Sequence, residues 1–353
     1  MFSVYTIWTV LCKQLVKELS DYYCSVCKQP KVYYFRNFCG MSYGRLQKGE
    51  EDIRQEQMQI LREFIAAREI AHHCRSNNYI YTHLHELGNY AFTIDLDKLP
   101  LVQRMFLENR YIFEAIAKHV RVKELLAEVR VYPSLEQFVV TKSGTDPELL
   151  KHLVEYLLSN EYYDRPRIFT DASKSADGRC GIGVYDEPSG IRIMMQLKLD
   201  TSIMTAETLA IKLAMQHIVD RGIRNAVLLT DSQPACLFLK KSRKSRSINS
   251  VANEILENAK KANVTIQWVP SHIGIEGNET ADRLSKEALS TEFVLENDIF
   301  VNDAINYFEE KQARRINNWY QEYIRLKGKS LKQLFSGSEE EDPYWFMEQN
   351  YTQ

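Results

Sequence analysis

The 353-residue sequence lacks several features that define specialised classes of protein. It has no run of about 18 apolar residues free of charge, so we predict no membrane-spanning helix. Glycine and proline are scarce, with 14 and 9 residues, which excludes a collagen-like or Pro/Gly-rich low-complexity chain. Hydrophobic residues make up 44% of the sequence, which is enough to build sizeable cores.

Charge and cysteine usage narrow the possibilities further. The formal net charge is only −2, so any nucleic-acid binding has to depend on local clusters of charge. Seven cysteines, an odd number spread along the chain, argue against a secreted disulfide framework. The apolar run Val4–Cys12 has no basic segment before it and no clear cleavage site after it, unlike a signal peptide. We therefore expect an intracellular protein, cytoplasmic or nuclear or both, that is not secreted.

Changes in sequence pattern divide the chain into three regions. Residues 1–160 are expected to be mostly helical, residues 165–290 alternate β-rich runs with helices, and residues 291–353 form a helical tail that becomes polar. Within the first region, Leu101–Ala127 is predicted as one or two helices. Asp146 before Pro147 predicts a capped helix start.

The middle region has the pattern of an α/β domain. Its elements follow the order βββαβαβα. We predict strands at 168–171, 181–185, 191–197, 226–231 and 264–269, and helices at 205–220, 249–262 and 278–289, the last capped by Asn278.

Four acidic residues in this region lie next to apolar segments. Asp171 and Asp231 end the first and fourth strands, where ligands of α/β sheets gather. Glu207 lies in the first turn of its predicted helix, at the head of an apolar stripe, and Asp282 lies near the start of the last helix. Taken singly, each has an ordinary alternative as a turn former, a helix cap or an acid that complements the helix dipole.

Taken together, the four acids predict a metal site. Carboxylates that meet at one end of a sheet repel each other unless a cation is present, and hard divalent ions such as Mg²⁺ or Mn²⁺ prefer oxygen ligands. Pairs of such ions are a standard device for hydrolysing phosphodiesters.

The motifs around these acids resemble a known family. They are Phe169–Ser173, Thr205–Glu207, Thr230–Gln233 and the long string Trp268–Asp282, which contains Pro-Ser-His, two glycines and Asn-Glu-Thr-Ala-Asp. The segment from about 165 to 290 resembles the type 1 ribonuclease H family, and more narrowly the ribonuclease H domains of non-LTR retrotransposon polyproteins. The resemblance implies an α/β fold with a mixed five-stranded sheet and flanking helices, here preceded by a mostly helical region.

The resemblance also implies an activity and a set of site residues. The implied reaction is two-metal endonucleolytic hydrolysis of the RNA strand of an RNA–DNA hybrid, with Mg²⁺ or Mn²⁺ as cofactor. The implied metal ligands are Asp171, Glu207, Asp231 and Asp282. His272 matches a catalytic histidine that assists proton transfer or product release, in a loop flanked by Gly274 and Gly277.

Contacts with the hybrid are predicted at two places. Ser173, Gln233 and Asn278 match family positions that face the nucleic acid. The cluster at 240–246 offers Lys240, Lys241, Arg243 and Lys244 to the phosphates, although a solvated loop or linker is an equal alternative.

Other functions stay open. A non-catalytic nucleic-acid-binding module could keep this fold, although no expected carboxylate is missing. An interaction protein could depend on residues 1–160, where Cys24, Cys27 and Cys39 lack a fourth zinc ligand at proper spacing. Integrases, transposases and proofreading exonucleases share the fold, but the Ser-His-Ile-Gly string argues against them.

Overall fold

The computed structural model describes residues 43–76, 78–88, 95–135 and 144–327. The three cysteines considered as zinc ligands and the part of the predicted tail beyond residue 327 lie outside these described residues. None of the described helices has the length and apolar character needed to span a membrane.

The chain divides into two compact units. The helical unit takes its described residues from segments 43–74, 78–113 and 304–327, and the α/β unit takes them from 75–76 and 114–303. Residues 114–160, which the sequence analysis grouped with the helical region, therefore lie in the α/β unit.

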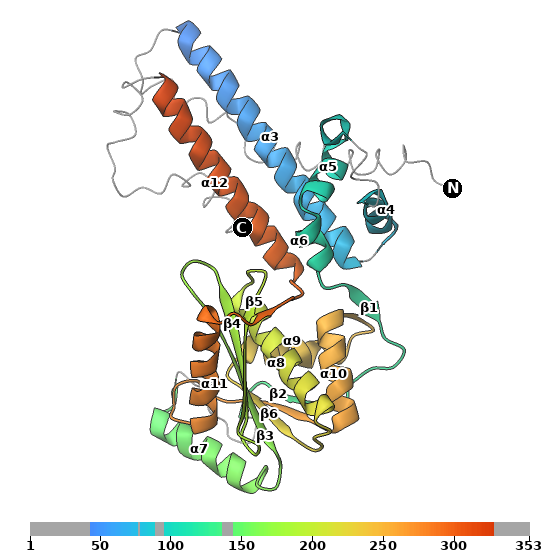
Figure 1. Cartoon of the computed structure of the whole chain (residues 1–353), viewed down its shortest axis with the longest axis vertical. Coiled ribbons are helices and arrows are strands. Elements are labelled where there is room, and N and C mark those ends of the chain that lie inside the picture. Colours follow the sequence, from blue (N-terminus) through green and yellow to red (C-terminus); the bar gives the residue numbers. More distant parts are fainter. Residues whose placement is uncertain (1–42, 77, 89–94, 136–143, 328–353) are drawn as a thin grey trace. The chain divides into compact units, whose positions relative to one another are not determined.

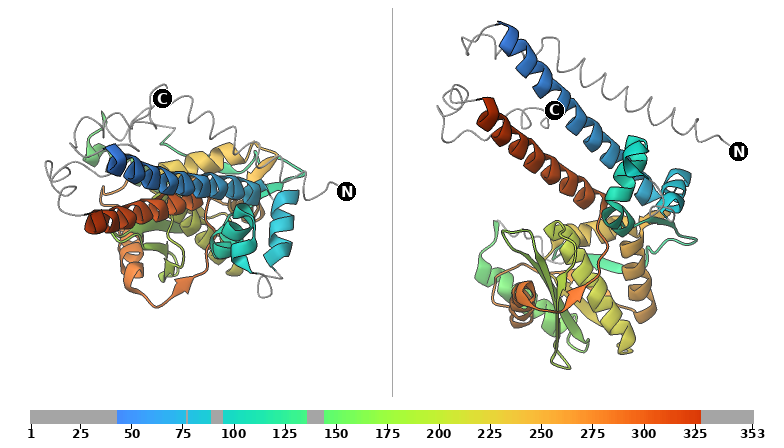
Figure 2. Two further views of the ribbon diagram at one scale, coloured as in Figure 1. Left: turned by 90° about the horizontal axis from the view of Figure 1, so that it is seen from above. Right: turned by 45° about the horizontal axis from the view of Figure 1, so that its top comes forward.

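The helical unit is built around two long helices, α3 and α12, which lie side by side (Figure 1 and Figure 2). Its helices are α3 (Tyr43–Ser76), α4 (Tyr79–Gly88), α5 (Leu101–Glu108), α6 (Arg110–Ala115) and α12 (Val301–Lys327), with a 3-10 turn at Leu96–Lys98. Phe113 stacks between Phe106 and Phe308, with ring centroids 5.8 and 5.1 Å apart. The predicted helical stretch 101–127 is wrong beyond residue 115, because the chain there becomes extended and pairs as a strand.

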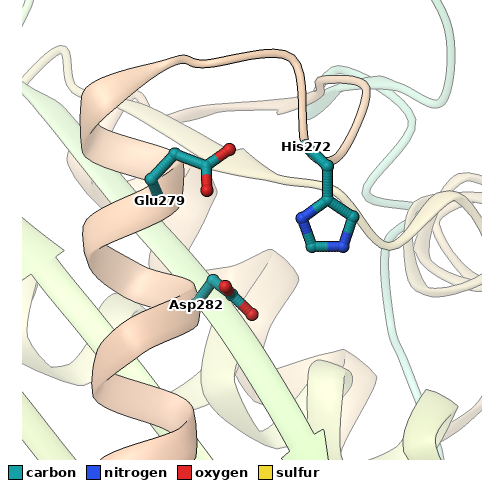
Figure 3. Close-up of side chains that lie close together, drawn as sticks. All are labelled: His272, Glu279 and Asp282. Atoms are coloured by element: carbon teal, nitrogen blue, oxygen red, sulfur yellow. The ribbon is translucent and has the colours of Figure 1, made fainter.

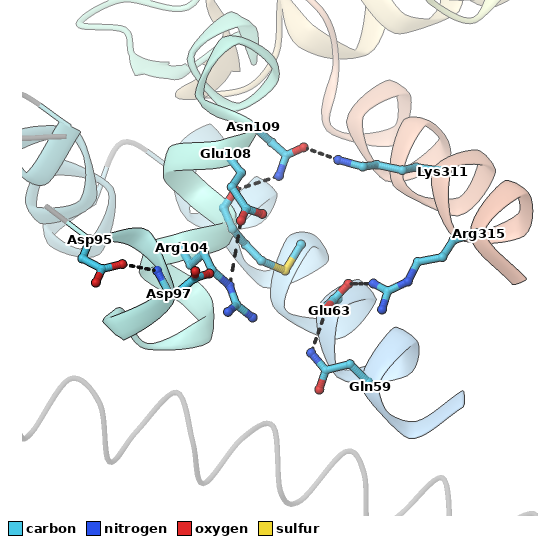
Figure 4. A network of polar contacts seen from close by, with 10 residues as sticks. Gln59, Glu63, Asp95, Asp97, Arg104, Glu108, Asn109, Lys311 and Arg315 are labelled. Carbon is cyan, nitrogen blue, oxygen red and sulfur yellow. Dashed lines mark hydrogen bonds and ion pairs between the residues drawn. The ribbon is translucent and has the colours of Figure 1, made fainter. Parts of the chain in front are cut away.

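A polar network joins the helices of this unit (Figure 4). Lys311 of α12 donates to the Asn109 side chain at 2.7 Å, and Arg315 of α12 pairs with Glu63 of α3. These groups line a cavity of about 310 Å³, whose apolar wall includes Phe64 and Phe308. The ion pair of Arg315 with Glu63 thus links the two long helices.

The α/β unit contains a large sheet with helices on both faces. Its helices are α7 (Pro147–Asn160), α8 (Ile203–Asp220), α9 (Gln233–Ser242), α10 (Ser250–Ala262) and α11 (Glu276–Glu287), with a 3-10 turn at Ala288–Ser290. Its strands are β1 (His119–Arg121), β2 (Arg130–Tyr132), β3 (Arg167–Lys174), β4 (Cys180–Asp186), β5 (Ile191–Leu197), β6 (Val227–Thr230), β7 (Ser247–Asn249), β8 (Thr265–Trp268) and β9 (Val294–Leu295).

The five predicted strands are confirmed as the centre of a mixed sheet. The described strands form a seven-stranded sheet in the order β2-β8-β6-β3-β4-β5-β9, and β1 and β7 form a separate antiparallel pair. Strands β3, β4 and β5 pair antiparallel in that order, whereas the pairs β3–β6, β6–β8, β8–β2 and β5–β9 are parallel. The edge strands β2 and β9 extend the sheet beyond the five strands expected from the sequence, because edges with unpaired backbone groups accept even very short partners.

Helices cover the two faces of this sheet, α8 and α10 on one and α11 on the other (Figure 1). Close approach of α11 depends on two glycines of β4. A Cβ atom at Gly181 would lie 2.3 Å from the carbonyl oxygen of Ser285, and one at Gly183 would lie 2.7 Å from the nitrogen of Ser285. The helix is therefore pressed against the strand at Ser285.

Local capping explains where several helices begin. The predicted start of α7 is confirmed, since the Asp146 side chain accepts from the backbone N–H groups of Glu148 and Leu149. The helix α9 was not predicted, although Ser232 caps it and Pro234 lies in its first turn. The predicted Asn278 cap is wrong: α11 begins at Glu276, and Asn278 is buried within its first turn.

Candidate active site

Parallel pairing of β3 and β6 brings two acids together. Thr170 is in register with Thr230, so Asp171 and Asp231 follow side by side. β3 continues to Lys174, so Asp171 lies within the strand and does not end it as predicted, whereas Asp231 directly follows the last residue of β6. Neighbouring strands lie only about 4.8 Å apart, which places the two side chains at the same edge. The predicted neighbourhood of the two strands is confirmed.

Glu207 joins this pair from α8. The helix begins at Ile203 after a Ser202 cap, so Glu207 lies in the second turn and not in the first turn as predicted. Its apolar stripe is fully buried, which orients the helix and directs Glu207 inward with only 6% exposure. Ligand oxygens of Asp171, Glu207 and Asp231 all lie within 4.8 Å of one another.

Crowding of these carboxylates makes their ionisation unfavourable. Burial, together with the negative charges of Asp231 and Asp282, raises the pKa of Asp171 to about 7, against a hydrogen bond from Ser285 that lowers it. Burial, with Asp171 and Asp231 adding their charges, also holds the pKa of Glu207 well above its usual range. Without a counter-charge, full ionisation of the three carboxylates near neutral pH is therefore unfavourable in free energy.

The donor set fits a hard divalent cation. Oε2 of Glu207 is buried and has no hydrogen-bond partner among the described residues. Oxygen ligands alone, at mutual distances below 4.8 Å, are the environment that Mg²⁺ and Mn²⁺ favour. A cation would both neutralise the acids and satisfy the unpartnered oxygen.

A second group of possible ligands lies at the start of α11 (Figure 3). His272, Glu279 and Asp282 each offer a ligand atom, and these atoms also lie within 4.8 Å of one another. Asp282 is half-buried and pairs with Lys286 at 2.7 Å. The structure thus places Asp282 with His272 rather than within the three-acid group, although its charge still contributes to the raised pKa of Asp171.

Sequence reasoning missed Glu279. The residue stands inside the Asn-Glu-Thr-Ala-Asp string that was recognised, but no role was assigned to it. Its spacing was informative, because residues three positions apart on a helix face the same side, and Glu279 lies three positions before Asp282.

The loop that carries His272 has unusual backbone geometry. His272 is exposed and has a φ of 56°, and Gly274 follows with a φ of 76°. Gly277 does not act as a flexible end of this loop, since it is buried in α11. A Cβ atom there would lie 2.2 Å from the Phe169 ring, so this glycine allows close packing of α11 on β3.

The predicted substrate contacts fall into different environments. Gln233 is exposed at the start of α9, and its amide donates to the carbonyl of Pro133 at 2.9 Å. Asn278 is buried, and its amide nitrogen lies 3.4 Å from Oδ2 of Asp231, which suits a supporting position behind that acid. Ser173 is half-buried on β3, two residues beyond Asp171.

The predicted cationic cluster is only partly exposed. Lys240 and Lys241 lie in the last turn of α9, where positive charge complements the helix dipole. The guanidinium of Arg243 donates a hydrogen bond to the carbonyl of Val129, so it makes a contact inside the α/β unit. Lys244, in contrast, is exposed.

Comparison with known families gives one match that bears on this site. A family model described as RNase H matches residues 164–290. The matched stretch runs from just before β3 to the 3-10 turn that follows α11 and contains Asp171, Glu207, Asp231, His272 and Asp282.

Proposed function

Residues 164–290 form a domain of the type 1 ribonuclease H family, and from this premise we propose that the protein is a metal-dependent endonuclease. Its substrate would be an RNA–DNA hybrid, of which it would hydrolyse the RNA strand. The observation that carries the proposal is the cluster of Asp171, Glu207 and Asp231, whose ligand oxygens lie within 4.8 Å of one another. Ionisation of these carboxylates is unfavourable unless a cation offsets their charge.

The protein's own groups divide the work between holding cations and handling substrate. Asp171, Glu207 and Asp231 would hold one divalent ion, and Asp282 with its neighbours would supply ligands for a second. Such ions, when bound, acidify a coordinated water and neutralise charge on the phosphate and the leaving oxygen. His272, exposed at the edge of the site, would assist proton transfer or product release.

Selectivity for the hybrid requires contacts that distinguish RNA from DNA. Ser173 and Gln233 lie at the carboxyl ends of β3 and β6, where polar groups would meet a 2′-hydroxyl or the sugar–phosphate backbone. The lysines at 240, 241 and 244 would attract the phosphates of the DNA strand, with a corresponding dependence on salt.

The test is cleavage of labelled RNA–DNA hybrid by the full chain with Mg²⁺, beside single-stranded RNA, duplex RNA and duplex DNA. We expect cleavage of the hybrid's RNA alone, abolished by EDTA and by Asp171→Asn or Glu207→Gln. Asp220→Asn is the matched control, because it removes a charge from the exposed far end of α8. A folded protein that binds the hybrid without cutting it would contradict the proposal and favour a binding module.

A further inference from the structure

Ser285 of α11 contacts Asp171, one of the three acids of the candidate cation site. The residue is fully buried, and its Oγ lies 2.6 Å from Oδ2 of Asp171. The same Oγ lies 2.7 Å from Oγ of Ser173 and 2.8 Å from the carbonyl oxygen of Asp282. Three polar groups from β3 and α11 therefore surround this one hydroxyl.

The hydroxyl of Ser285 has a single proton, so it cannot serve both acceptors at once. It donates either to Asp171 or to the carbonyl of Asp282, while Ser173 can donate to it in turn. A hydrogen bond to an ionised carboxylate is stronger than one to a neutral carbonyl. Ionisation of Asp171 therefore favours the chain in which Ser173 donates to Ser285 and Ser285 donates to Asp171.

The position of this donor is fixed by packing. Both Gly181 and Gly183 of β4 lie against the backbone of Ser285, at distances that leave no room even for a Cβ atom. Because the absence of a Cβ atom at these two positions allows α11 to lie directly on β4, the hydroxyl comes within hydrogen-bonding distance of Asp171.

We propose that Ser285 is a positioning residue, which fixes the Asp171 carboxylate for binding of the divalent cation. By occupying Oδ2 it leaves Oδ1 for the ion, and it lowers the cost of keeping Asp171 charged. Ser173 completes the arrangement from the side where substrate is expected. The proposal rests on the proposed function, since it concerns the ligand that the same site would hold.

The experiment is titration calorimetry of the full chain with Mg²⁺ in the absence of nucleic acid. We expect Ser285→Ala to weaken Mg²⁺ binding roughly tenfold, as is typical when a partner of a metal ligand is lost. Ser285→Cys, which keeps a weak donor of similar size, should fall between wild type and alanine. Ser242→Ala, the same change at a buried serine of α9, should bind Mg²⁺ like the wild type.

Cleavage as a function of Mg²⁺ concentration separates positioning from general damage. A positioning defect raises the Mg²⁺ concentration needed for half-maximal rate and is overcome by excess Mg²⁺, whereas a misfolded protein stays slow at every concentration. Unchanged Mg²⁺ affinity in both Ser285 variants, in a wild type that binds Mg²⁺ and cleaves, would overturn this proposal alone. A wild type that neither binds nor cleaves would overturn the proposed function together with it.

Discussion

Removing the charge of Asp171 should stabilise the metal-free protein at neutral and higher pH. The carboxylate is 5% exposed and faces Asp231 and Glu207, so its ionisation in the folded state is opposed by burial and by like charge. The variant Asp171→Asn keeps the shape of the side chain and still accepts the hydrogen bond from Ser285. It therefore removes the unfavourable charge and little else.

The sign and size follow from the raised pKa. Folded Asp171 titrates at about 7, whereas an unfolded aspartate titrates at about 3.9, so only the folded state holds the proton between these values. Stability contributed by that proton is complete below about pH 4 and is lost as pH rises to about 7. The loss amounts to roughly 4 kcal/mol above pH 7, of which roughly 1.5 kcal/mol has already occurred at about pH 5.

Hydrogen exchange of the backbone amides of β3 and β6, read by mass spectrometry in EDTA, measures this stability within the α/β unit. We expect Asp171→Asn to be more stable than wild type by a few kcal/mol at about pH 8, with the gap narrowing toward pH 5. Added Mg²⁺ should stabilise wild type more than the variant, because the cation supplies the missing counter-charge. The reasoning would be refuted by a variant that is no more stable than wild type at pH 8. It would also be refuted by a difference in stability that does not change with pH.

Two further predictions concern packing. Gly277→Ala should destabilise the α/β unit by about 1–3 kcal/mol in urea unfolding, because the new Cβ would overlap the Phe169 ring, and Phe169→Leu should restore part of the loss. An unchanged unfolding free energy would contradict the close contact. A truncated chain that starts at residue 161 should be less soluble and melt lower than one that starts at residue 114, since it loses α7 and strand β2 that covers the edge of β8. Equal melting temperatures would show that this segment is dispensable.

Much of the site could be predicted because its signals are local. An acid directly after an apolar β-rich run, as at Asp171 and Asp231, can be recognised from a few residues, although β3 continues past Asp171 to Lys174. The apolar stripe behind Glu207 repeats at helical spacing. The partition of the acids into two groups could not be predicted, since it depends on how α11 and its preceding loop lie against β3.

Corrections arose where short-range and long-range signals competed. Asn278 is a good capping residue by type, but it is buried beside Asp231 because α11 begins two residues earlier. Helix α9 was not predicted because the positive charges at its end are also typical of a solvated linker. The capping serine and the proline at its start are typical of a helix start and would have indicated it.

By itself the sequence determined the α/β class, the five central strands and the two acids carried by or following β3 and β6, because periodicity and capping act within a few residues. Tertiary structure decided the rest. The edge strands β2 and β9 have three and two residues, too few for a periodic pattern, and exist because the sheet offers them partners. The contact of Ser285 with Asp171 joins positions 114 residues apart and depends on two glycines of a third segment. Only the folded chain brings such groups within hydrogen-bonding distance.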